Sequence, residues 1–138
     1  MKSHSVIVIS GATGGIGKGI SEALYKQGYS LALLGRSRHK LEKLRSFLDM
    51  SPSIKIYPLD ICSLSEISDT IDSIINDFGR IDHLVQAAGD GPLSSALDFN
   101  DDNWHKTINT KLLGTARLVS LVSKKMNDVD LDYSITII

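Results

Sequence analysis

Short apolar runs alternate with longer segments of helical periodicity along this chain. Five runs have the length of strands and are rich in branched side chains; they cover residues 6–9, 31–34, 54–57, 81–85 and 133–138. The runs are mostly apolar, as strands buried on both faces would be. The pattern therefore predicts five strands, most of them covered on both sides.

Between these runs, apolar residues recur every three or four positions, as they do on one face of an amphipathic helix. Four such segments lie near residues 16–24, 41–48, 67–78 and 102–126. Gly28 and Gly79 follow two of them as typical helix stops, and polar residues 100–103 are suited to begin the last one. Every strand but the last is thus followed by a helix.

This alternation predicts the arrangement of the whole chain. Strands that alternate with helices form parallel sheets, because each helix carries the chain back to the start of the next strand. We therefore expect an α/β fold of the doubly wound, Rossmann type, with about five parallel strands and helices on both faces. No linker or repeat divides residues 1–138, which indicates a single domain.

Composition excludes several classes of function. The 138 residues are 42% hydrophobic and 22% charged, with a formal net charge of -1, so nothing favours binding to nucleic acid or to a membrane. No apolar run is long enough for a membrane span or a signal peptide. The single cysteine, Cys62, excludes an internal disulfide, and the four histidines lack metal-ligand spacing. We expect a soluble, cytoplasmic protein without a metal site.

Glycines cluster between the first predicted strand and the first predicted helix, at positions 11, 14, 15 and 17. A helix begins there, and its free N–H groups and partial positive charge suit an anion. The spacing Gly-x-x-x-Gly-x-Gly differs from both Gly-x-Gly-x-x-Gly and the Walker phosphate loop. A pyrophosphate is the favoured occupant, and a tight turn without a ligand is the alternative.

Four motifs together resemble those of the short-chain dehydrogenase/reductase family. SGATGGIG at 10–17 resembles its Thr-Gly-x-x-x-Gly-x-Gly motif, with serine in place of threonine. PLDI at 58–61 resembles its aspartate motif, QAAG at 86–89 its Asn-Asn-Ala-Gly motif, and NTKLLG at 109–114 its helix-borne asparagine. The motifs keep the family's order, and the resemblance spans the chain. It implies hydride transfer between a nicotinamide cofactor and a small-molecule carbonyl or alcohol.

The resemblance also implies a set of cofactor-binding residues, which are Ser10, Gly11, Gly15, Ile16, Gly17, Asp60, Ile61, Ala88 and Gly89. The three glycines of the first motif would surround the pyrophosphate. Asp60 would accept a hydrogen bond from the adenine amine, Ile61 would line the base pocket, and Gly89 would let the backbone approach the nicotinamide ribose. Without the resemblance, Asp60 is an ordinary turn carboxylate and Gly89 an ordinary turn glycine.

Asn109 is the one catalytic residue that the resemblance implies within this chain. It is similar to the family asparagine that kinks the long helix and holds a water in the catalytic proton relay. The alternative is a polar position in mid-helix that faces solvent, where asparagine costs little.

The residues after the second predicted strand indicate which nicotinamide cofactor is used. An acidic residue there binds the ribose 2′-hydroxyl of NAD, whereas arginine accommodates the 2′-phosphate of NADP. This chain has Arg36 and Ser37 at that place and no acid within reach. The pattern favours NADP(H) over NAD(H), with solvent-exposed arginines at a helix start as the alternative.

The tyrosine that the family uses as the acid to protonate the substrate oxygen during hydride transfer has no counterpart in this sequence. The family has a tyrosine followed four residues later by lysine, together with a serine, whereas none of the tyrosines 25, 29, 57 and 133 is followed by lysine at that spacing. We therefore expect the incomplete, cofactor-binding part of such a domain, which reduces no carbonyl by itself. The alternatives are a non-catalytic nucleotide-binding or interaction module and an inactive remnant.

Self-association is the last expectation from the sequence. In the family, the helix corresponding to residues 102–126 contributes to a dimer interface, and its apolar positions here are more than one sheet face can cover. The run Ile135–Ile138 is prone to form a strand that recruits other chains. We expect contacts between copies through helix 102–126 or through the carboxy-terminal strand.

Overall fold

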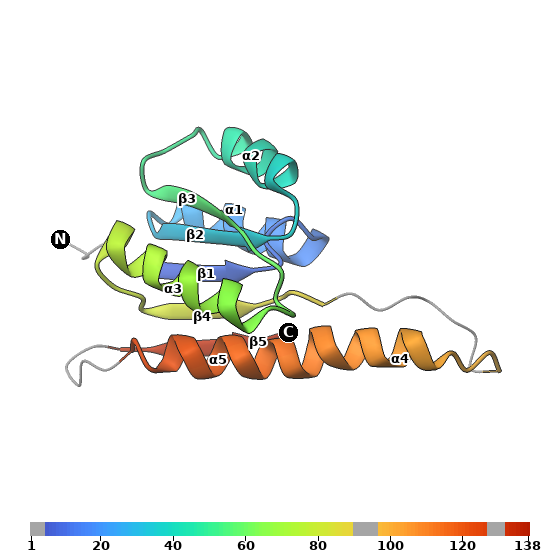
Figure 1. Cartoon of the computed structure of the whole chain (residues 1–138). Coiled ribbons are helices and arrows are strands. Elements are labelled where there is room, and N and C mark those ends of the chain that lie inside the picture. Colours follow the sequence, from blue (N-terminus) through green and yellow to red (C-terminus); the bar gives the residue numbers. More distant parts are fainter. Residues whose placement is uncertain (1–4, 90–96, 127–131) are drawn as a thin grey trace.

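A five-stranded parallel sheet forms the centre of the protein (Figure 1). The computed structural model describes residues 5–89, 97–126 and 132–138. The strands are β1 (Val6–Ser10), β2 (Ser30–Gly35), β3 (Ile54–Pro58), β4 (His83–Gln86) and β5 (Ser134–Ile137). Their order in the sheet is β3-β2-β1-β4-β5, so β1 lies at the centre, where the order reverses.

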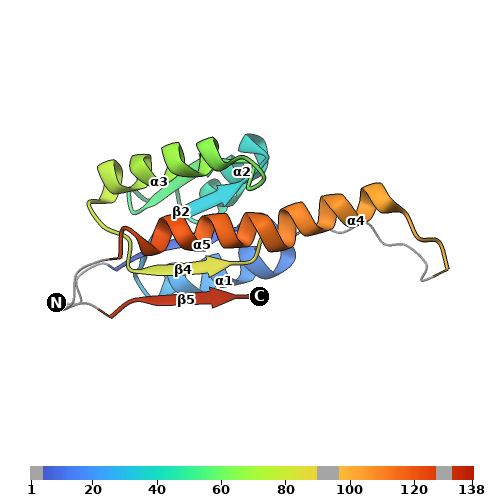
Figure 2. The ribbon, with the colours of Figure 1, turned by 60° about the horizontal axis from the view of Figure 1, so that its bottom comes forward.

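Helices cover both faces of this sheet, which confirms the predicted doubly wound α/β fold. On one face lie α1 (Gly15–Lys26) and α2 (Arg38–Phe47), and on the other α3 (Leu64–Phe78) and α5 (Thr115–Ser123). Two further segments precede α5, and these are α4 (Asp101–Thr107) and the π-helix η1 (Ile108–Gly114). Together with α5 they form one long helical stretch that extends past the carboxyl ends of the strands (Figure 2). None of the described helices is both long and apolar enough to cross a membrane.

The central strand shows why the apolar runs are continuous. Alternate side chains of β1 point to opposite faces, and each face is covered by helices. Val8 packs with Ile71 of α3 and Leu118 of α5, whereas Ile9 packs with Leu41 of α2. No residue of β1 is more than 3% exposed. Burial of each such side chain contributes about 1.5–3 kcal/mol, so the two-sided core is the main stabilising feature.

The last predicted helix differs from the expectation in its internal geometry. It begins at Asp101, after the Asn100 side chain accepts a hydrogen bond from the backbone N–H of Asn103 at 2.9 Å. Seven residues of π-helix then interrupt it, and the regular helix ends at Ser123 rather than Met126. A π-helix widens the turn without changing the residue types that favour a helix, so apolar periodicity does not reveal it.

The strand predicted over residues 81–85 begins two residues later, at His83; before it, the backbone N–H of Asp82 donates to the carbonyl oxygen of Val6 at 2.9 Å, and the side chain of Asp82 is also hydrogen-bonded. Its carboxylate accepts a hydrogen bond from the backbone N–H of Val6 at 2.7 Å, and Arg80 Nε lies 2.9 Å from each carboxylate oxygen. The Asp82 side chain is only 2% exposed. A buried carboxylate is tolerated when donors surround it, so this group joins the start of β1 to the segment entering β4.

A second polar cluster joins the edge strand β3 to α3. The hydroxyl of Tyr57 donates to Asp77 at 2.6 Å, and Lys55 pairs with the other oxygen of Asp77 at 2.9 Å. The hydrogen bond from Tyr57, followed by the contact with Lys55, lowers the pKa of Asp77, and burial raises the pKa of Tyr57. The ionised Asp77 therefore stabilises the folded protein at pH values above the pKa that Asp77 has in the unfolded chain. This contribution is lost as the pH falls through the lower pKa that Asp77 has in the folded protein.

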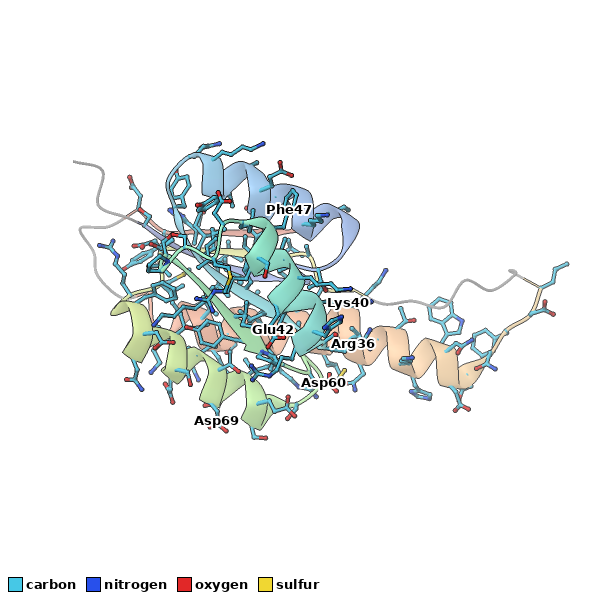
Figure 3. All side chains as sticks on the ribbon, turned by 90° about the horizontal axis from the view of Figure 1, so that it is seen from above. Arg36, Lys40, Glu42, Phe47, Asp60 and Asp69 are labelled. Atoms are coloured by element: carbon cyan, nitrogen blue, oxygen red, sulfur yellow. The ribbon has the colours of Figure 1, made fainter. Side chains whose placement is uncertain are left out.

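Replacing Asp82 tests the importance of the buried carboxylate. We expect Asp82→Asn to lower the free energy of unfolding by about 1.5–3 kcal/mol, because the amide has one acceptor oxygen instead of two and lacks the negative charge that strengthens the hydrogen bonds from Val6 and Arg80. Urea unfolding followed by circular dichroism measures this change. The control is Asp69→Asn, at an exposed aspartate on α3 (Figure 3), which should change stability by less than about 0.5 kcal/mol. Equal losses in the two variants would contradict the assignment.

Candidate functional site

A cleft of about 370 Å³ lies at the carboxyl ends of the strands. Its walls come from the ends of β1, β2 and β4, from the loop after β3, and from α4 and η1. The lining residues are Ser10, Gly11, Thr13, Gly14, Leu34, Gly35, Arg36, Lys40, Leu59, Asp60, Ile61, Cys62, Ala87, Ala88, Gly89, Lys106 and Thr110. In open α/β sheets, ligands bind at this edge, beside the point where the strand order reverses.

The glycines of the β1–α1 turn serve different purposes. Gly11 has a φ of 72°, and a Cβ there would lie 2.6 Å from the backbone nitrogen of Ala88. A Cβ at Gly17 would lie 2.1 Å from the carbonyl oxygen of Gly11. A Cβ at Gly15, in contrast, would meet no atom of the surrounding structure within 4 Å. Gly11 and Gly17 are therefore needed for packing of the turn, whereas Gly15 leaves open space.

The amino end of α1 is suited to an anion. No side chain caps it, and its first turn contains no acidic residue. The helices α2, α3 and α4 are each capped by a side chain, from Ser37, Ser63 and Asn100. The N–H groups in the first turn of a helix have no acceptor within the helix, and the helix dipole is positive there. The turn thus directs donors and positive potential toward the cleft.

Basic side chains line the cleft beside the end of β2. Arg36 and Lys40 are both exposed, and Figure 3 shows them with Asp60 near the amino end of α2. Ser37 caps α2 by accepting a hydrogen bond from the backbone N–H of Lys40 at 3.3 Å, and it does not line the cleft. Lys40 is a residue that the sequence reasoning missed, although basic residues at 36, 38 and 40 in the sequence could have indicated it.

The loop after β3 is held from two sides. The carboxylate of Asp60 accepts a hydrogen bond from the backbone N–H of Cys62 at 2.9 Å, and the backbone N–H of Asp60 donates to Glu66 at 2.9 Å. Ile61 is buried and packs against Gly114, where a Cβ would meet Ile61 at 3.1 Å. Asp60 is thus a turn carboxylate and also a residue of the cleft wall.

Asn109 lies in η1, but its side chain does not line the cleft. The side-chain Oδ1 of Asn109 accepts a hydrogen bond from Arg117 at 3.1 Å. Arg117 also donates to the backbone carbonyl oxygen of Cys62 at 3.1 Å. The residues of α4 and η1 that do line the cleft are Lys106 and Thr110. The catalytic role of Asn109 stays a prediction.

Gln86 stands at the end of β4, where the resembling motif has asparagine. The residue is 1% exposed, and its amide nitrogen donates to the carbonyl oxygen of Ala88 at 3.1 Å and to the hydroxyl of Thr115 at 2.9 Å. Glutamine therefore braces the end of β4 against α5, and it holds the backbone that forms one wall of the cleft.

The cleft brings together seven of the predicted cofactor residues, which are Ser10, Gly11, Arg36, Asp60, Ile61, Ala88 and Gly89. Five predicted residues lie outside its lining, and these are Gly15, Ile16, Gly17, Ser37 and Asn109. The binding roles of both groups stay predictions. The lining residues Thr13, Gly14, Lys106 and Thr110 were missed, and of these only Gly14 belongs to the predicted glycine cluster.

Comparison with protein families finds a match to the short chain dehydrogenase family over residues 5–131. An uncharacterized oxidoreductase of Staphylococcus epidermidis is 33% identical over 116 residues, which are 84% of this chain and 50% of that protein. The chain thus spans about half the length of the curated relatives it matches.

Solved structures resemble the whole described fold. A short-chain dehydrogenase/reductase from Brucella melitensis has a TM-score of 0.90 at 28% identity, over 98% of this chain and 56% of that one. The NADP-bound structure of ElxO has a TM-score of 0.86 at 26% identity, over 97% and 55%. An NAD+-bound xylitol dehydrogenase has a TM-score of 0.88 at 26% identity, over 97% and 52%.

A matched pair of glycine replacements tests the packing of the turn. We expect Gly17→Ala to lower the free energy of unfolding by about 1–3 kcal/mol, because its Cβ would overlap the carbonyl oxygen of Gly11. Gly15→Ala should leave stability unchanged or raise it by up to about 1 kcal/mol, since alanine favours a helix and the space is open. Thermal and urea unfolding measure both, and equal effects would show that the turn relaxes around Gly17.

Proposed function

The chain belongs to the short-chain dehydrogenase family, and we propose that its cleft binds NADP(H) as the cofactor-binding part of an oxidoreductase that acts on a carbonyl or alcohol. The observation that carries the choice of cofactor is the pair Arg36 and Lys40 at the end of β2. Residues 30–41 contain no Asp or Glu, so no carboxylate on this segment would bind the 2′-hydroxyl of NAD.

The residues present fit a dinucleotide phosphate. The uncapped amino end of α1 suits the pyrophosphate, and the side chains of Arg36 and Lys40 suit a phosphate on the adenosine ribose. In this proposal Asp60 and Ile61, which line the same cleft, bind the adenine. Solved relatives include NADP-bound and NAD+-bound proteins, so the proposed preference depends on these two cations and the missing acid.

In this proposal the chain's own residues bind and orient the cofactor. The nicotinamide ring, when bound, donates or accepts the hydride. The turn at Gly11 and the end of β4 at Ala88 form the floor of the cleft, so one face of a bound ring would be shielded from water by protein. The single cysteine fits a reducing compartment, and the proposal includes a cytoplasmic location.

The 138 residues contain no tyrosine with a lysine four residues later, so the proposed carbonyl reduction would take its general acid from elsewhere in the protein. The same observation favours a second candidate function, a nucleotide-binding module that does no chemistry. Both candidates require that the cleft bind the dinucleotide.

Affinity for the two cofactors tests the proposal. We expect NADPH to bind about tenfold to a hundredfold more tightly than NADH, because the 2′-phosphate gains charge-assisted hydrogen bonds. Titration followed by cofactor fluorescence gives both dissociation constants. Arg36→Asp should abolish the preference by placing a carboxylate beside the 2′ position.

Lys43→Met is the matched control for this measurement, because Lys43 is an exposed lysine of α2 that does not line the cleft. It should keep the ratio of the two constants. Equal affinities in the unmodified chain, or an unchanged ratio in Arg36→Asp, would overturn the NADP(H) proposal.

We also propose that the chain associates with a second copy of itself. Several large apolar side chains are exposed along the α4–η1 surface: Phe99 and Trp104, whose rings stack 6.0 Å apart, and Ile108, Leu112 and Leu113. In the described sheet β5 is an edge strand, and Ile137 is 61% exposed. Exposed apolar patches and strand edges of this kind bind other chains.

Light scattering after size-exclusion chromatography tests this proposal. We expect an average mass above that of a monomer that falls on dilution, and a lower mass for Leu112→Glu or Ile137→Lys according to which surface is used. Met50→Lys is the control, since Met50 is exposed on the turn before β3, away from both surfaces. A monomer at every concentration would contradict self-association.

A further inference from the structure

The π-helix η1 carries a lysine across the end of β4. A Cβ at Gly89 would lie 3.0 Å from Cε and 3.4 Å from Cγ of Lys111, so the aliphatic stem of Lys111 rests on the backbone of Gly89. Gly89 is part of the cleft lining. Because the ammonium is bonded to Cε, the positive charge of Lys111 is held beside this end of the cleft.

The two residues of η1 before Lys111 make other contacts, although Thr110 also lines the cleft. The side chain of Asn109 binds Arg117, and the hydroxyl of Thr110 donates to the carbonyl oxygen of Lys106 at 2.9 Å and lies 3.6 Å from the sulfur of Cys62. The wider turn of a π-helix changes which positions face the sheet. Among residues 109–111, Lys111 is therefore the charged side chain that the fold directs to the end of β4.

The two ends of the cleft differ in what they would hold. A dinucleotide lies across the point where the strand order reverses, with its pyrophosphate at the first βα turn. If Arg36 and Lys40 hold the adenosine half over β2, the other half lies over β4, against Gly89. Lys106 also lines the cleft and adds a further cation to it.

We propose that Lys111 binds the nicotinamide half of the dinucleotide, its ammonium donating to the phosphate or ribose oxygens of that half. The inference depends on the proposed cofactor, and it makes Lys111 rather than Asn109 the η1 residue that contacts the nicotinamide half. A side chain at position 89 would have to move the stem of Lys111, because its Cβ would lie 3.0 Å from Cε of the lysine.

Two ligands separate this contact from the rest of the site. NADPH contains both halves, whereas adenosine 2′,5′-bisphosphate contains only the adenine half. We expect Lys111→Met to lower the affinity for NADPH about fivefold to twentyfold, because a charge-assisted hydrogen bond is lost. The affinity for adenosine 2′,5′-bisphosphate should stay unchanged. Lys111→Arg should keep most of the NADPH affinity. Calorimetric titration of the full chain measures both ligands.

Lys124→Met is the matched control, because Lys124 is an exposed lysine at the other end of the same helical stretch. It should change neither affinity. If Lys111→Met leaves the affinity for NADPH unchanged, or lowers the affinity for both ligands equally, the inference is wrong. If the unmodified chain binds neither ligand, the proposed function fails and the inference fails with it.

Discussion

The cleft depends on how closely the backbone of the β1–α1 turn approaches its surroundings. The turn meets the end of β4 at Gly11 and its own helix at Gly17, and at both points a Cβ would lie closer than atoms pack. Only residues 11–14 join β1 to α1, so the uncapped amino end of α1 lies near the carboxyl end of β1, the strand at which the order reverses. The position of the proposed anion site thus depends on two glycines that are needed for packing.

The opposite wall of the cleft depends on contacts between segments far apart in the chain. Arg117 of α5 donates both to Asn109 and to the carbonyl oxygen of Cys62 in the loop after β3, and Gly114 lies against Ile61 of the same loop. The loop that contains Asp60 is therefore held by the helix that carries Lys111. A shift of η1 would therefore disturb both the loop after β3, at Ile61, and the backbone of Gly89.

The sequence predicts the strands, the helices and their layers well, because two-sided burial makes β1 and β2 continuous apolar runs and one-sided burial makes α3 periodic. It predicts less of the site. The π-helix leaves no signature in apolar spacing, so Asn109 follows from a motif alone, and only the structure shows that its side chain turns to Arg117. Lys40 and Lys106 reach the cleft through tertiary placement, which local patterns do not contain. The predicted start of β4 is wrong by two residues, and the sequence does not reveal that the Asp82 carboxylate is a buried acceptor for the backbone N–H of Val6.

Overall charge gives no reason to expect an anionic ligand, since the chain has 15 basic and 16 acidic residues. The fold redistributes these charges. Among the residues that line the cleft, Arg36, Lys40 and Lys106 are basic and Asp60 is acidic, and the positive end of the α1 dipole adds to the same side. The field that an approaching anion meets is set by these local groups, because charges farther away than about 8 Å are screened at physiological salt. A protein that is nearly neutral overall can therefore attract a polyanionic cofactor to one edge of its sheet, and composition alone does not report on such a site.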